Sequence, residues 1–240
     1  MRLGEYAEKF KHTINQSESD SMLTLHGFPF SNYHNIVKHA LMQKGVPFDE
    51  HIVYPNTPEM LAVNPTGKAP AMTTEKGTQL SESSVLLEYL EDAYPEHSLF
   101  PEDVEVRGRV RQLMKVSELY LELAARRLLP AVLGNIDFPQ ATLDEVKSVL
   151  ERGAHSLTAL ANFGPYLVGS ELTLADIYLR YALAIPKMVG PAKLDWNVME
   201  VVPGLADWDA MMASTDIAQK IDADQKANAT EFMAFISKPK

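Results

Sequence analysis

The sequence of 240 residues contains no cysteine. This absence excludes a disulfide framework, a thiolate metal site and a protein thiol that acts as nucleophile. The absence of cysteine does not indicate whether the protein works in an oxidising or a reducing compartment. If the protein carries out thiol chemistry, the sulfur must therefore arrive with the ligand.

Long apolar runs and excess positive charge are also absent. No run approaches the about 18 apolar residues of a transmembrane helix, and the first 21 residues lack the apolar centre of a signal peptide. The formal net charge of -10 argues against a sequence-independent nucleic-acid binder. We therefore expect a cytoplasmic protein with no nucleic-acid partner and no membrane insertion, although a few placed donors could still hold a small anion.

The composition that remains is ordinary for a globular protein, with 46% hydrophobic and 22% charged residues. The length suits one large domain or two modest ones. Residues 1–21 are predicted to form an N-terminal extension, either a short amphipathic helix or a flexible leader.

Residues 22–97 alternate between strand and helix patterns. Residues 22–26 and 48–54 alternate as strands, and an apolar helical face over 36–41 lies between them, closed by Gly45. Turn residues at 64–68 precede short strands at 69–73 and 79–80, joined by a hairpin turn at 75–78. A helical stripe then runs from Ser83 to Tyr94. The predicted order is βαβ followed by ββα.

From residue 98 onward the pattern changes. Residues 98–106 are predicted to be a linker, and helical periods follow at 107–133, 142–162, 173–189 and 203–219. Thr173 and Asp176 form a capping box at the start of the third period. The predicted domains are an α/β domain over 22–97 and an all-α domain over 107–240.

Four segments in this order resemble the cytosolic-type glutathione S-transferases, in their bacterial-like form with an active-site serine. They are LHGFPFSNYHNIVKHAL at 25–41, NPTGKAPAM at 64–72, LSESSVLLEYLEDAYP at 80–95 and LTLADIYL at 172–179. The resemblance implies a thioredoxin-like N-terminal domain, an all-helical C-terminal domain and a homodimer. It also implies glutathione as a co-substrate, with no permanently bound cofactor.

The implied reaction is detoxification, in which the glutathione thiol attacks a small electrophilic or apolar acceptor. Two alternatives stay open. One is a glutathione-dependent isomerase, dehalogenase or lyase on the same fold. The other is a non-catalytic module that binds glutathione or a protein.

Ser31 occupies the active-site serine position in this resemblance. A hydroxyl at a helix N-terminus can donate a hydrogen bond to the glutathione sulfur, and the helix dipole favours the thiolate, which is the nucleophile. A simple N-cap would use the same residue. Asn32 and Tyr33 are alternative thiol contacts.

The resemblance also assigns the other glutathione contacts. It makes the Ala69–Pro70 peptide cis, so that the Ala69 backbone pairs with the cysteine of glutathione like an added strand. Lys68 would hold the glycine carboxylate, unless it is an exposed loop lysine. Glu82 and Ser83 begin a helix, where Ser83 would bind the γ-glutamyl carboxylate and Glu82 the α-ammonium, unless they only cap that helix.

The remaining candidates are less specific. Tyr120 and Arg127 are possible residues of the acceptor pocket, although a surface role fits them equally well. The seven histidines show no metal-ligand spacing and no HExxH motif, so no metal site is predicted.

Overall fold

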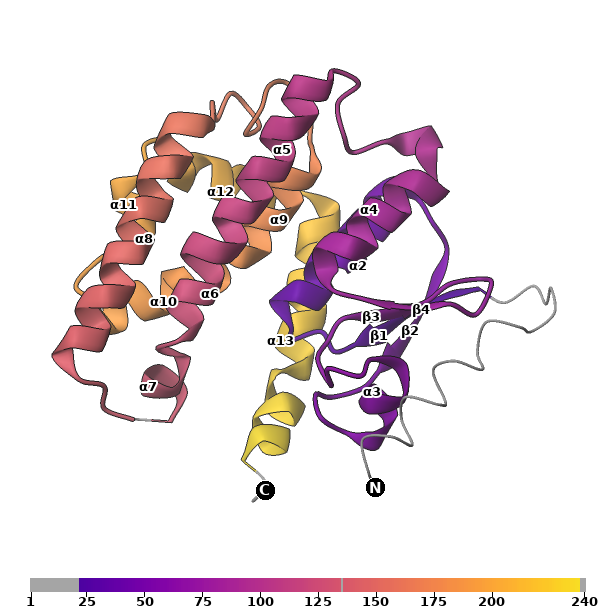
Figure 1. Ribbon diagram of the computed structural model, residues 1–240, viewed down its shortest axis with the longest axis horizontal. Coiled ribbons are helices and arrows are strands. Elements are labelled where there is room, and N and C mark those ends of the chain that lie inside the picture. The colour runs from indigo at the N-terminus through magenta and orange to yellow at the C-terminus, as the bar shows by residue number, and fades with distance from the viewer. Residues whose placement is uncertain (1–21, 135, 238–240) are drawn as a thin grey trace. The chain divides into compact units, whose positions relative to one another are not determined.

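The computed structural model describes residues 22–134 and 136–237, so the predicted extension 1–21 lies outside the described residues. The chain divides into two compact units. One runs up to Ser98 and resumes at Asp216, and the other spans Leu99–Thr215. Figure 1 shows the elements of each unit along the chain.

The first unit is built around a four-stranded sheet in the order β2-β1-β3-β4. β1 pairs with β2 in parallel and with β3 antiparallel, and β3 pairs with β4 antiparallel. The elements are β1 (Leu23–Gly27), α2 (Asn32–Lys44), β2 (Phe48–Ile52), α3 (Pro58–Val63), β3 (Ala71–Thr73), β4 (Gln79–Ser81) and α4 (Ser83–Ala93). The predicted βαβ-ββα order is confirmed, and it is the arrangement of a thioredoxin-like domain.

Alternation along β1 places the fully buried Leu23 and Leu25 on one face of the sheet. The helices α2 and α4 lie on one side of the sheet and α3 on the other (Figure 1). Ser31 and Gly45 cap α2 at its two ends, as their residue types favour. The short helix α3, which the sequence patterns did not predict, begins behind Thr57 with Pro58 at its first position.

The last helix, α13 (Asp216–Ile236), belongs with the first unit and packs on α2. The sequence patterns place all of 107–240 in one helical domain and end the last helical period at 219. The structure differs because the buried face of α13 continues from Ala218 and Ile221 to Asn228. The C-terminal segment thus returns to the sheet domain.

The second unit is all-helical, as predicted. After the 3-10 turn η1 (Pro95–His97) of the first unit, it contains the elements α5 (Val104–Val116), η2 (a π-helix, Ser117–Glu122), α6 (Leu123–Arg126), α7 (Leu129–Leu133), α8 (Gln140–Leu160), α9 (Leu174–Ala182), α10 (Ala184–Lys193), α11 (Val198–Val201) and α12 (Leu205–Ala213). The helix α5 begins inside the predicted linker because the Asp103 side chain accepts hydrogen bonds from two backbone amides of its first turn.

Two features show how closely this unit is packed. The predicted capping box at Thr173 is present, and the buried Asp176 carboxylate also accepts hydrogen bonds from the Leu167 amide and the Trp208 indole. In α8, a Cβ at Gly153 would lie only 2.9 Å from the Tyr120 carbonyl oxygen, so a side chain there would push against the backbone of η2.

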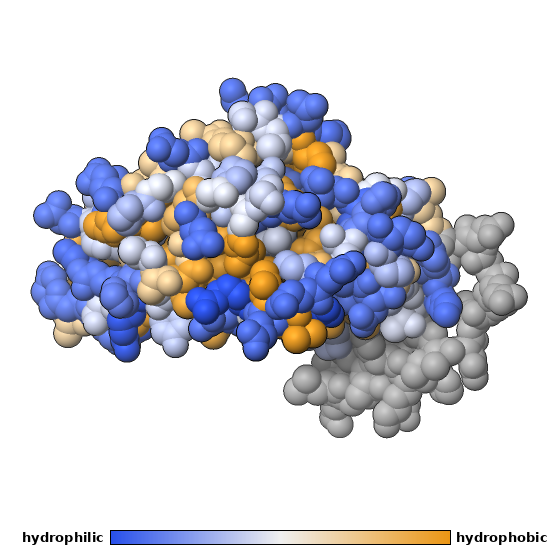
Figure 2. Space-filling model, turned by 90° about the horizontal axis from the view of Figure 1, so that it is seen from above, coloured by the Kyte–Doolittle hydropathy of each residue, from blue (hydrophilic) through white to orange (hydrophobic). Residues whose placement is uncertain are grey.

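The surface is mainly hydrophilic on the face drawn in Figure 2, with apolar side chains scattered between the polar ones. Within residues 22–134 and 136–237, no helix is both long and apolar enough to cross a bilayer.

Candidate functional site

Ser31 lies where the loop after β1 enters α2. Its backbone is extended, and its Oγ accepts a hydrogen bond from the His34 amide at 3.3 Å. A hydroxyl that accepts a bond in this way keeps its own proton for donation to another acceptor. The side chain is partly exposed. Ser31 is therefore a helix cap and an available hydrogen-bond donor at the same time.

His34 ties this first turn of α2 to the sheet. Its Nε2 lies 3.0 Å from Glu50 on β2, and a Cβ at Gly27 would lie only 2.4 Å from its Nδ1. Only glycine allows β1 to end so close to this ring. Burial lowers the pKa of His34 despite the opposing effect of Glu50, so the ring is neutral near pH 7. The Glu50 contact then assigns the proton to Nε2.

The Ala69–Pro70 peptide is cis, as predicted. The strand register pairs His26 with Ala71 and Ala71 with Ser81. This register brings the end of β1, the start of β3 and the end of β4 to one end of the sheet. The segments that carry Ser31, Pro70 and Ser83 therefore leave the sheet at the same end.

Glu82 and Ser83 start α4 at this end. Glu82 adopts a φ of 71°, a left-handed conformation that is uncommon for a residue other than glycine. Such a conformation costs about 1–3 kcal/mol, and residues that adopt it cluster at active sites and ligand clamps. Ser83 is buried as the first residue of the helix. The predicted role of both residues in binding the γ-glutamyl group stays a prediction.

The neighbouring candidates differ in exposure. Lys68 is exposed, while its carbonyl oxygen accepts a hydrogen bond from buried Asn64 at 2.7 Å, so the loop is fixed and the side chain reaches solvent. Asn32 is buried at the start of α2, and Tyr33 is half-buried. Both stay alternatives to Ser31 as thiol contacts.

Tyr120 and Arg127 lie in the second unit. Tyr120 is 41% exposed on η2. Arg127 makes a two-pronged ion pair with Glu145, with distances of 3.0 Å and 3.1 Å between nitrogen and oxygen. This partner occupies the guanidinium group, and the role of both residues in acceptor binding stays a prediction. Among the described residues, no three side chains come together as a metal site.

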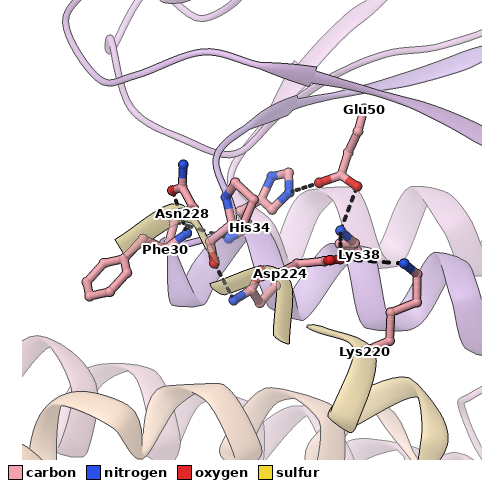
Figure 3. A network of polar contacts seen from close by, with 10 residues as sticks. Phe30, His34, Lys38, Glu50, Lys220, Asp224 and Asn228 are labelled. Atoms are coloured by element: carbon pink, nitrogen blue, oxygen red, sulfur yellow. Dashed lines mark hydrogen bonds and ion pairs between the residues drawn. The ribbon is translucent and has the colours of Figure 1, made fainter. Parts of the chain in front are cut away.

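Sequence reasoning missed Asn228 on α13, which contacts the loop before Ser31 (Figure 3). The Phe30 amide donates to Asn228 Oδ1 at 3.3 Å, and Asn228 Nδ2 donates to the Tyr54 hydroxyl at 2.8 Å. A signal was present in the sequence. Positions 218, 221, 225, 228, 232 and 235 lie on one helical face, on which the polar Gln225 and Asn228 stand between apolar residues.

A thioredoxin-like sheet domain with a hydroxyl at the start of its first helix, joined to an all-helical unit, defines the architecture of a glutathione transferase. The sequence matches the family models of the glutathione S-transferase N-terminal domain at 25–98 and C-terminal domain at 130–216. A glutathione S-transferase of Pseudomonas putida is 35% identical over 90% of this chain and 98% of its own. The chain belongs to the glutathione S-transferase family, which confirms the predicted family and class of enzyme.

Solved structures show the same fold. A β-etherase from Sphingobium superposes with a TM-score of 0.72 at 23% identity, covering 85% of this chain and 99% of its own. A glutathione transferase homologue from Sulfitobacter, with bound glutathione, gives 0.68 at 22% identity and covers 84% and 97%. These identities are low, so the two structures support the fold alone.

Proposed function

We propose that this protein binds glutathione at the end of the sheet formed by the Ser31, Pro70 and Ser83 segments, and that Ser31 stabilises the thiolate. The observation that carries the proposal is the hydrogen bonding of Ser31. Its oxygen accepts from the His34 amide, and this leaves the hydroxyl proton able to donate to another acceptor. A glutathione sulfur at the α2 N-terminus would accept that proton in a hydrogen bond and gain from the helix dipole.

The remaining parts of glutathione are assigned to the other candidate residues. The Ala69 backbone pairs with the cysteine of glutathione, Ser83 and Glu82 bind the γ-glutamyl end, and Lys68 binds the glycine carboxylate. None of these residues reacts covalently. The protein lowers the barrier by ionising the thiol and holding it beside the acceptor, a small electrophile.

We expect glutathione to be a consumed co-substrate, the protein to be a cytoplasmic homodimer, and nucleic acid and membrane to play no part. These assignments are supported by the family membership. Sedimentation of the purified protein tests the dimer directly.

A steady-state assay with glutathione and an aryl halide electrophile tests the reaction. We expect conjugation at neutral pH, with kcat reduced by about tenfold or more in Ser31→Ala, the scale of one lost catalytic hydrogen-bond donor or positioning group. Asn32→Ala and Tyr33→Phe are the matched controls, and a larger loss in either would transfer the role to that residue. Consumption of one glutathione per turnover separates transfer from isomerisation, which returns glutathione unchanged.

A further inference from the structure

We infer that Asn228 of α13 is a positioning residue for Ser31, so that the last helix is part of the thiol-activating site. The inference rests on the proposed function and deepens it. It concerns a segment beyond the family matches, which cover 25–98 and 130–216, whereas Asn228 lies twelve residues after their end.

The backbone of the loop before Ser31 is held by three hydrogen bonds. The Ser31 amide donates to the Phe28 carbonyl at 3.0 Å, and the Asn35 side chain donates to the Pro29 carbonyl at 2.9 Å. The Phe30 amide donates to Asn228 Oδ1 at 3.3 Å. Of these three bonds, the last is the one supplied by a distant part of the chain. Asn228 thus holds the Pro29–Phe30 peptide, which lies one peptide before the bond between Phe30 and Ser31.

Asn228 is itself held in place. It is 8% exposed, and its amide nitrogen donates to the Tyr54 hydroxyl at 2.8 Å. One turn further along α13, the Phe232 ring stacks on those of Phe28 and Phe30, with centroid distances of 5.1 Å and 4.9 Å. The helix α13 therefore contacts the loop in two ways: Asn228 hydrogen-bonds to its backbone, and Phe232 stacks on its aromatic side chains.

An ion-pair network sets the register of α13 one turn before Asn228. Lys38 of α2 lies 2.9 Å from Asp224 and 2.6 Å from Glu50 (Figure 3). The Lys38 side chain is 4% exposed, whereas those of Asp224 and Glu50 are 33% and 26% exposed, so the ammonium is shielded from solvent and the two carboxylates are only partly so. Two polar contacts on successive turns hold α13 in one position along α2, which places the carboxamide of Asn228 opposite the Phe30 amide.

The consequence for catalysis is geometric. A hydrogen bond from Ser31 to a sulfur depends on where the hydroxyl stands, and a misplacement of about 1 Å can cost about 100-fold in rate. Without the Asn228 carboxamide, the partly buried Phe30 amide would lack this partner and the loop would relax to find another. Glutathione affinity would change little, because its γ-glutamyl and backbone contacts lie on other segments.

The experiment uses the full chain and follows the ultraviolet thiolate band of bound glutathione against pH, together with kcat and KM. Asn228→Leu removes the hydrogen bonds of the carboxamide at similar volume. Tyr54→Phe keeps the carboxamide and removes the hydroxyl that accepts from it, together with the hydrogen bond between that hydroxyl and Glu231. Ile221→Ala is the control, since it removes a fully buried side chain from the same helix two turns before Asn228. A rescue variant is Asn228→Asp combined with Glu231→Gln, because the Glu231 carboxylate lies 3.5 Å from Asn228 Nδ2.

We expect Asn228→Leu to lower both kcat and the thiolate fraction at neutral pH by about tenfold, with a near-normal glutathione Kd. Tyr54→Phe shifts both in the same direction by less, and the rescue variant approaches the wild type. Ile221→Ala lowers the melting temperature and leaves the thiol pKa of bound glutathione at its wild-type value.

Two results would overturn the inference. One is a wild-type thiol pKa in Asn228→Leu, or in Tyr54→Phe if the leucine variant does not fold. The other is a shift in Ile221→Ala as large as that in Asn228→Leu, which would make the effect one of helix stability. If wild-type protein binds glutathione without a thiolate band, the proposed function itself fails, a result recognisable because the wild type lacks the signal.

Discussion

Replacing Lys38 with methionine tests the buried charges that join α13 to α2. The ammonium lies within 2.9 Å of both Asp224 and Glu50, whose side chains are 33% and 26% exposed. Removing one partner of a buried ion pair costs about 3–5 kcal/mol. Because water still reaches both carboxylates, we expect a smaller loss, about 2–3 kcal/mol. In a chain of this size that lowers Tm by about 4–12 °C.

The matched control is Lys220→Met. Lys220 is 62% exposed and lies 3.7 Å from the same Asp224, so its loss should change stability by less than about 0.5 kcal/mol. Urea unfolding followed by circular dichroism gives both values. Trp196 and Trp208, the two tryptophans, lie in the second unit, so their fluorescence reports whether the effect stays in the first unit.

The pH dependence supplies a second, independent check. Burial raises the pKa of Glu50, but hydrogen bonds from His34 and Lys38 outweigh it and set the pKa well below its usual value. A depressed carboxyl pKa stabilises the fold above the unfolded pKa, near 4.5, and this stability is lost as pH falls through the folded value. The cost of Lys38→Met should therefore shrink between pH 7 and pH 3. Equal costs at the two pH values, or an effect no larger than that of Lys220→Met, would refute the reasoning.

Three further changes test other parts of the structure. Gly153→Ala should lower the free energy of unfolding in urea by about 1–3 kcal/mol, because its Cβ would meet the η2 backbone. Gly108→Ala, whose Cβ would meet nothing within 4 Å, should raise it by about 0.5–1 kcal/mol. Equal effects of the two substitutions would contradict the packing of Gly153 against η2. Burial and a neighbouring histidine lower the pKa of His26 to about 4, so the folded state loses about 3 kcal/mol as pH falls from 6.5 to 4. His26→Gln should flatten that loss, and exposed His155→Gln should not. Asp176→Ala should lower stability by about 3–5 kcal/mol in thermal melting, because it leaves the buried Leu167 amide and Trp208 indole without their hydrogen-bond acceptor. A loss below about 1 kcal/mol would contradict that assignment.

Local chemistry made much of the fold predictable from the sequence. Ser31 and Gly45 bound α2 because their residue types satisfy the two ends of a helix, and the alternation around Leu25 is typical of a strand with a buried face. The left-handed backbone at Glu82 was not predictable, since a glutamate carries no local preference for it.

The contacts of α13 were out of reach for a different reason. The helical stripe around Asn228, which is apolar at both ends, predicts a helix with one buried face, but it does not specify the surface that this face covers. The bond between Phe30 and Asn228 joins residues 198 positions apart, and no local pattern specifies such a pair. The candidate site was therefore predictable where it depends on caps and turns, and not where a distant helix completes it.

The most direct test of the central claim is the pH titration of the thiolate band of glutathione bound to wild-type protein and to Ser31→Ala. We expect the thiol pKa of bound glutathione to lie well below that of free glutathione in the wild type. In Ser31→Ala, which lacks the hydroxyl, we expect this pKa to return towards the free value. A wild-type titration identical to that of Ser31→Ala would contradict it.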